Sequence, residues 1–394
     1  MKPMPFFCVA LACVAFCRPA VGVSQAAGPG AVVTDSADVR IITSTGGDAI
    51  CARVAGEPAL TIGVVDGPDA LMFQRIVSVA RDGEGRLVVA DAGWGEIRVF
   101  DAGGEHVLTI GREGEGPGEF QNLSGAWPGS GGNIFAVDGW QLRITEFGPV
   151  GEIESVTRIE GVEVPIFFRF WGPGGPGSIL SSVTTLGARD LSHGEASRSS
   201  MEFRLHGLDG SVMKTVARLP GVAQGILRSN GDVLHMPVPF TLESSATGHA
   251  AGVAATTGET YELRLFDTAG KLSRIARLAE TPPEWTLEHL EAGVPNERLR
   301  TLAQDFPLPA TLPGYDRLAA ADTGEIWARR YMLPRGATVH WDVFQPDGRY
   351  LGRVDVPAAF RLHGVSDGQL LGVHEDELGV QRVQVLDLRW GGAG

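Results

Sequence analysis

The chain has 394 residues, of which 43% are hydrophobic and 20% are charged, and its formal net charge is −14. This length and apolar content can supply a large buried core, which excludes an intrinsically disordered chain. The acidic balance, with no basic run, excludes nucleic-acid binding through phosphate neutralisation. The 54 glycines are typical of many short strands joined by tight turns.

Residues 1–26 have the pattern of a signal peptide. Lys2 gives a positive start, residues 6–16 are apolar, and small residues stand at Ser24 and Ala26. The apolar run is too short to cross about 30 Å of hydrocarbon as a helix. The sequence therefore predicts export to the periplasm or the medium, with no transmembrane span once the signal is removed.

A lipoprotein is the alternative form of export, because Cys13 follows the segment Ala10-Leu11-Ala12. If residues 1–26 are removed, Cys51 is the only cysteine left, so no internal disulfide can form. Cys51 lies in an apolar stretch and is interpreted as a small buried hydrophobic residue. Residues 27–38 are predicted to form a flexible segment.

A short pattern recurs along the rest of the chain. It consists of a glycine, a variable residue and then strand-forming residues, at intervals of about 45 residues with one interval twice as long. The copies begin at Gly85, Gly132, Gly177, Gly231, Gly324 and Gly368. A four-stranded propeller blade occupies about this length, and each copy has the position of a second strand.

A second pattern of strand, glycine turn and strand follows most copies. It begins at Glu96, Leu142, Phe203, Leu263 and Trp341, and these segments are predicted to be third and fourth strands. The last repeat has only a third strand, at 382–388. Residues 60–63 (LTIG) match residues 108–111, so the N-terminal strand is predicted to complete the last blade and close the ring.

The double interval after Gly231 contains only one hairpin of third and fourth strands. Its surplus is interpreted as a polar loop at 243–260 and a helical insert at 280–314. Asn296 is expected to cap the second of two short helices. The predicted fold is therefore all-β, a single six-bladed propeller over residues 39–390 with the helical insert between blades four and five.

Two segments carry a resemblance to a known family. GREGEGPGEF from Gly111 and VADAGWGEIRVFD from Val89 resemble NHL-type repeats. The chain resembles the six-bladed propellers of the TolB-like/NHL group in exported bacterial proteins, and this resemblance implies the fold and export. The third and fourth copies depart from the NHL pattern, since neither Gly177 nor Gly231 has an aspartate six positions on.

The inner strands should line a central channel, and several are predicted to start with charged residues. Arg75, Arg169, Arg317 and His363 would give a cationic channel mouth, which suits a small anion or an acidic peptide. The alternative is a calcium ion held by oxygen atoms of Asn122, Gln224 and Asp316, as in lactonase-type propellers. Arginines close to these residues would compete with a cation.

Aromatic residues on the connecting loops are the other candidate binding groups. Trp94 and Trp140 occupy matching loops, and Arg330 and Tyr331 occupy another. Aromatic and arginine side chains are frequent interface anchors. The alternative is that each tryptophan packs on a neighbouring blade.

No catalytic motif is present: neither a Gly-x-Ser-x-Gly elbow nor a His-Glu-x-x-His zinc motif occurs. Asp91 and Asp138, which repeat with Arg98 and Arg143, are interpreted as structural groups. The favoured function is a monomeric, non-enzymatic binding scaffold for a protein or a small ligand, without a cofactor or metal. A calcium-dependent lactonase-type hydrolase and a structural component of an envelope complex are the alternatives.

Overall fold

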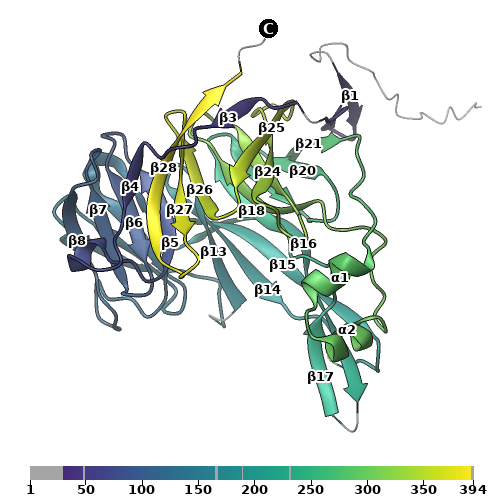
Figure 1. The fold of residues 1–394 in the computed structure, drawn as a ribbon. Helices are drawn as coiled ribbons and strands as arrows, with labels where there is room; N and C mark the ends of the chain where they lie inside the picture. Colours follow the sequence, from purple (N-terminus) through teal and green to yellow (C-terminus); the bar gives the residue numbers. More distant parts are fainter. Residues whose placement is uncertain (1–29, 48, 165–166, 189, 230–231, 392–394) are drawn as a thin grey trace, which may run out of the picture.

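The computed structural model describes residues 30–47, 49–164, 167–188, 190–229 and 232–391 (Figure 1). The predicted signal peptide at 1–26 lies outside the described residues.

Six sheets follow one another along the chain. The first two contain β5 (Ile76–Arg81), β6 (Leu87–Asp91), β7 (Glu96–Phe100) and β8 (His106–Ile110), then β9 (Leu123–Pro128), β10 (Ile134–Asp138), β11 (Arg143–Phe147) and β12 (Ile153–Arg158). The third contains β13 (Phe168–Gly175), β14 (Ser178–Thr185), β15 (Ala196–Gly207), β16 (Val212–Ser229) and β17 (Asp232–Pro237). The fourth contains β18 (Ser245–His249), β19 (Gly252–Thr256), β20 (Glu262–Phe266) and β21 (Leu272–Leu278). The last two contain β22 (Tyr315–Ala320), β23 (Ile326–Arg330), β24 (Thr338–Phe344) and β25 (Tyr350–Pro357), then β26 (Phe360–Ser366), β27 (Gln369–Glu375) and β28 (Gln381–Trp390).

The first strands of these sheets surround the centre of the molecule. They contact one another in the cyclic order β5, β9, β13, β18, β22 and β26, and β26 contacts β5 again. The amide of Asp322, just after β22, donates to the Val365 carbonyl on β26 at 3.0 Å, which links two of these strands directly. The protein is therefore a β-propeller, as the repeat predicts, and we refer to its sheets as blades one to six.

The N-terminal segment pairs with the outer edges of other blades. Strands β1 (Ala31–Ser36) and β2 (Val39–Ser44) form a hairpin, and β2 pairs in parallel with β21 of blade four. Strands β3 (Ala52–Val54) and β4 (Leu60–Ile62) pair with β28 of blade six. Residues 31–36, part of the segment 27–38 that the sequence predicts to be flexible, form strand β1 of this hairpin.

Blade four differs from the sequence-based interpretation. The strand after Gly231 is β17, a fifth strand of blade three, and the predicted polar loop at 243–260 contains β18 and β19. Small residues allow these strands to approach their neighbours closely. A Cβ atom on Gly248 would lie only 2.2 Å from the Pro173 carbonyl oxygen on β13. A pattern of bulky strand-forming residues therefore misses this blade.

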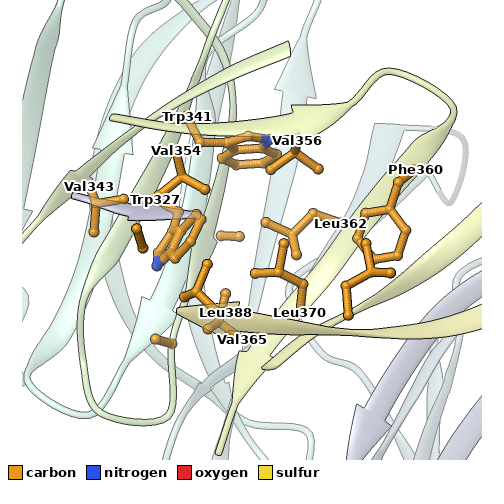
Figure 2. Close-up of a cluster of buried hydrophobic side chains, with 14 of the residues drawn as sticks. Trp327, Trp341, Val343, Val354, Val356, Phe360, Leu362, Val365, Leu370 and Leu388 are labelled. Carbon is orange, nitrogen blue, oxygen red and sulfur yellow. The ribbon is translucent and has the colours of Figure 1, made fainter. Parts of the chain in front are cut away.

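The hydrophobic cores lie between adjacent blades rather than at the centre of the ring. Figure 2 shows the cluster between blades five and six, in which Trp327 and Trp341 pack against Leu362 and Leu370. The two indole rings are 6.5 Å apart, with 62° between their planes, which is an edge-on contact. Each blade is thus held by the apolar faces of its neighbours.

Two short helices, α1 (Leu287–Gly293) and α2 (Glu297–Ala303), lie between β21 and β22 and beside β17 (Figure 1). Asn296 caps α2 as predicted, since its side chain accepts a hydrogen bond from the Leu299 amide at 3.0 Å. Ala303 belongs to a core that includes Leu227 of β16, so α2 packs on blade three. No helix in the described part of the chain is long and apolar enough to cross a membrane.

The repeated aspartates have the predicted structural role. Asp91, at the end of β6, accepts a hydrogen bond from the Arg75 amide at 2.8 Å, and Asp138 accepts one from the Asn122 amide at 3.2 Å. Each carboxylate therefore ties the end of a second strand to the residues just before an inner strand. Arg98 lies 3.9 Å from Asp91 and donates to the Met72 carbonyl at 2.6 Å.

Candidate binding site in the central channel

A cavity of about 1190 Å³ lies at the centre of the ring. Residues of all six inner strands line it. One part of its wall is aromatic, where Trp127 and Phe170 stack with ring centroids 5.4 Å apart. Another part carries charged side chains close to the starts of β13 and β22, and we call this part the channel mouth.

The channel mouth contains more cationic than anionic groups. Arg81 and Asp322 line the cavity at the far ends of β5 and β22. At the mouth, Arg169, Arg317 and Arg329 line it together with the carboxylates of Glu243 and Asp316. Each of the two carboxylates is paired. Asp316 accepts from Arg329 at 2.6 Å, and Glu243 accepts from Arg169. These pairs leave the third arginine, Arg317, as the surplus positive charge.

Arg317 has no hydrogen-bond or ion-pair partner among the described residues. Burial, together with the neighbouring charges of Arg329 and Arg361, lowers the pKa of its guanidinium to about 10. The arginine stays protonated at neutral pH, because this value is still well above 7. A buried cation of this kind is stabilised when an anion approaches it.

His363, on β26, adjoins the same surplus charge. Its Nε2 atom is buried without a hydrogen-bond partner among the described residues. Burial, Arg317 and Arg361 hold the pKa of this imidazole well below its ordinary value of 6.5. The imidazole is therefore neutral at neutral pH, and it offers one N–H donor and one acceptor to a ligand.

This pKa shift predicts a loss of stability in acid. The unfolded chain binds a proton at His363 below its ordinary pKa of 6.5, whereas the folded chain does not, so stability falls as pH falls through 6.5. Between about pH 7.5 and about pH 5.5, this histidine should lower the free energy of unfolding by about 1 kcal/mol. Urea unfolding of the wild type and of His363→Asn at both pH values measures this difference. An identical pH dependence in the two proteins would contradict it.

The structure brings together three of the four predicted channel residues. Arg169, Arg317 and His363 all line the channel. Arg75 does not line it: its guanidinium is exposed and donates to the Ala92 carbonyl at 3.1 Å. Arg75 is therefore not part of the channel site.

The exposed tryptophans lie on the same side of the ring as the channel mouth. Trp94 is 48% exposed and Trp140 is 61% exposed. Their loops follow β6 and β10, whose ends bond to the residues just before β5 and β9 through Asp91 and Asp138. Neither side chain is buried against a neighbouring blade, so both are available to a partner.

The other predicted loop pair has a structural role instead. Arg330 donates to Asp342 at 2.7 Å and to Glu280 at 2.9 Å, and only 15% of its side chain is exposed. Tyr331 packs against a small core that contains Phe240. Both side chains are partly buried in these contacts, so the structure gives no support to the prediction that they are interface anchors.

The proposed calcium ligands do not converge. Asp316 is paired with Arg329, and Gln224 lines a separate cavity beside β14, β15 and β16. Asn122 is not among the residues that line the channel. In the ranges that the structure describes, no cluster of three or more His, Cys, Asp or Glu side chains could hold a metal ion. The donor set of the channel mouth thus suits an anion rather than a cation.

Cys51 offers no nucleophile to the site. Burial raises the pKa of its thiol to about 11, so the reactive thiolate is scarce at neutral pH. The side chain is free of any disulfide and packs against the core between blades five and six. The interpretation of Cys51 as a small hydrophobic residue agrees with this environment.

Three charged residues at or near the channel mouth are absent from the predicted site. Arg361 lies at the start of β26, where the sequence-based register began two residues later, at His363. Arg329 lies directly across from Arg317 in the ladder of β22 and β23. Glu243 lies two residues before β18, within the predicted polar loop at 243–260. Correct assignment of the inner strands would have found Arg361 and Glu243.

Comparisons with known proteins agree on the fold. The DUF5128 family, described as a 6-bladed beta-propeller, matches residues 67–161. A member of the DUF4221 family from Bacteroides vulgatus has a TM-score of 0.53 at 11% identity, with 86% of this chain and 99% of that chain covered. No curated protein sequence matches this chain.

Two further solved structures are similar at lower scores. A putative exported protein from Bacteroides fragilis has a TM-score of 0.48 at 11% identity, with 89% of this chain and 98% of that chain covered. Regucalcin from Agrobacterium tumefaciens, a calcium-binding protein, has a TM-score of 0.42 at 12% identity, with 86% and 96% covered. At these identities the likeness concerns the fold alone.

Proposed function

We propose that this protein is a non-enzymatic binding scaffold that acts outside the cytoplasm as a monomer and holds an anionic ligand at the channel mouth. The observation that carries this function is Arg317, a guanidinium without a partner that faces a cavity of about 1190 Å³. Both carboxylates at the mouth are engaged by other arginines, which favours ligand binding over acid–base chemistry. Export and the NHL subtype rest on the sequence patterns.

A closed ring is part of this proposal, because the site draws on residues of several blades. We propose that β4 completes blade six and so closes the propeller. The pairing of Ile62 with Val383 on β28 supports this closure. The contact between β26 and β5 also supports a closed ring. A closed ring would hold Arg169 and Arg317 at a fixed spacing without any ligand.

Removal of the Arg317 charge should weaken anion binding. The probes are acetate, succinate, citrate and inorganic phosphate at constant ionic strength, measured by calorimetry on the protein without its signal peptide. Arg317→Gln should weaken the tightest of them by roughly 10- to 100-fold, since a hydrogen bond to a charged group contributes about 1.5–3 kcal/mol. Arg389→Gln is the matched control, because Arg389 is exposed on β28. Equal affinities in the two variants, or no binding to the wild type, would overturn the proposal.

A further inference from the structure

A second cavity, which we call the side pocket, has a volume of about 560 Å³ and lies beside β14, β15 and β16. Its wall is largely apolar and includes Leu186, Leu191, Met201, Val222 and Ile226. Leu186 is 44% exposed, so an apolar side chain faces solvent there. The outer part of blade three that forms the pocket is braced by α2, beside β17 in Figure 1.

The side pocket and the channel mouth share one wall residue, Glu243. The carboxylate of Glu243 accepts a hydrogen bond from Arg169. The Arg169 guanidinium also lies over the Trp171 ring, 4.4 Å from its centroid. This ion pair therefore stands at the boundary between a cationic cavity and an apolar one.

We propose that the ligand is an amphipathic anion, a carboxylate with an unbranched hydrocarbon chain. Its head group binds Arg317 in the channel mouth, and its chain passes Glu243 into the side pocket. This inference rests on the proposed function and adds the class of ligand to it. The positive charge of Arg317 favours a carboxylate head group. The exposed apolar wall of the side pocket favours a hydrocarbon chain.

The physical reason for such a ligand is that each cavity offers what the other lacks. The channel mouth has surplus positive charge, which a short carboxylate would satisfy. The side pocket has apolar surface in contact with water, and a hydrocarbon chain would remove that surface from solvent. A ligand with both parts would bind more tightly than either part alone.

The test is a series of straight-chain carboxylates from acetate to decanoate, kept below their micelle concentrations. Each methylene that enters the side pocket should tighten binding to the wild type about fourfold. Leu186→Asp places a charge on the pocket wall and should remove this dependence on chain length while acetate binds as before. Leu378→Asp is the matched control, since Leu378 is 88% exposed on the turn before β28.

Glu243→Gln gives an independent measurement at the boundary. It leaves Arg169 without its carboxylate partner, so every carboxylate in the series should bind more tightly, by about tenfold. Unchanged affinities would mean that the ligand does not pass this boundary and would overturn the inference.

The possible outcomes separate the inference from the proposed function. If acetate binds and longer chains bind no tighter, the side pocket is not used and the inference fails while the anion site stands. If the dependence on chain length persists in Leu186→Asp, the chain lies elsewhere, for example along Trp127 and Phe170, and the inference fails again. If no carboxylate or phosphate binds, the anion site itself is wrong.

Discussion

Replacement of Trp327 by alanine is expected to lower the free energy of unfolding by about 3–5 kcal/mol. Trp327 is fully buried in the cluster between blades five and six, where Figure 2 shows its ring among valine and leucine side chains of both blades. Alanine would leave a cavity there, because neighbouring backbone strands cannot collapse into it. Urea unfolding monitored by circular dichroism measures the loss.

Two further variants make this measurement specific. Trp327→Phe keeps an aromatic ring and loses an indole N–H that has no hydrogen-bond partner among the described residues, so it should cost less than about 1.5 kcal/mol. Trp140→Ala removes a tryptophan that is 61% exposed and should change stability by less than about 0.5 kcal/mol. A similar loss in Trp140→Ala and Trp327→Ala would show that burial between blades is not what stabilises the ring.

Much of the fold was predictable because each blade carries its own local signal. The glycines at Gly85, Gly132 and Gly368 stand one or two positions before second strands, as the repeat predicts. At Gly85 the backbone has φ of 86°, a conformation that glycine adopts without strain. The glycine itself therefore indicates the turn in the sequence. The cap at Asn296 is local in the same way.

Blades three and four were assigned poorly because their strands depend on distant neighbours. The strand after Gly231 pairs with β16 instead of starting a new blade. The buried strand β19 contains Ala254 and Ala255, whose small side chains give little strand propensity but fit between neighbouring sheets. Tertiary packing determines the strand pairing of these segments, and a short stretch of sequence does not contain that information.

The candidate site was predictable in its charge but not in its pairing. Arg169 and Arg317 were found because charged residues start inner strands. The partner of Arg169 is Glu243, 74 positions further along the chain. Only the ring brings these two side chains together. Because Glu243 pairs with Arg169, it is not a partner for Arg317. The unpaired guanidinium of Arg317, which best supports the proposed function, could therefore not be derived from the sequence.

Substitution of Ile62 by aspartate should destabilise the protein by about 4 kcal/mol. Ile62, on β4, is 3% exposed and packs in the cluster between blades six and one, with Val383 of β28 and Val89 of β6. The change removes buried apolar surface and places a carboxylate where no hydrogen-bond donor is provided. If β4 closes the ring, its loss should also release blade six, which limited proteolysis at β27 and β28 would detect.

Val65→Asp is the control for this substitution, because Val65 follows β4 by three positions and is 65% exposed. It introduces the same charge in the same segment and should change the free energy of unfolding by less than about 0.5 kcal/mol. A small effect in both variants would mean that blade six is stable without β4. In that case the contact between β26 and β5 would be enough to hold the ring, and the fixed spacing of the channel arginines would have to come from the inner strands alone.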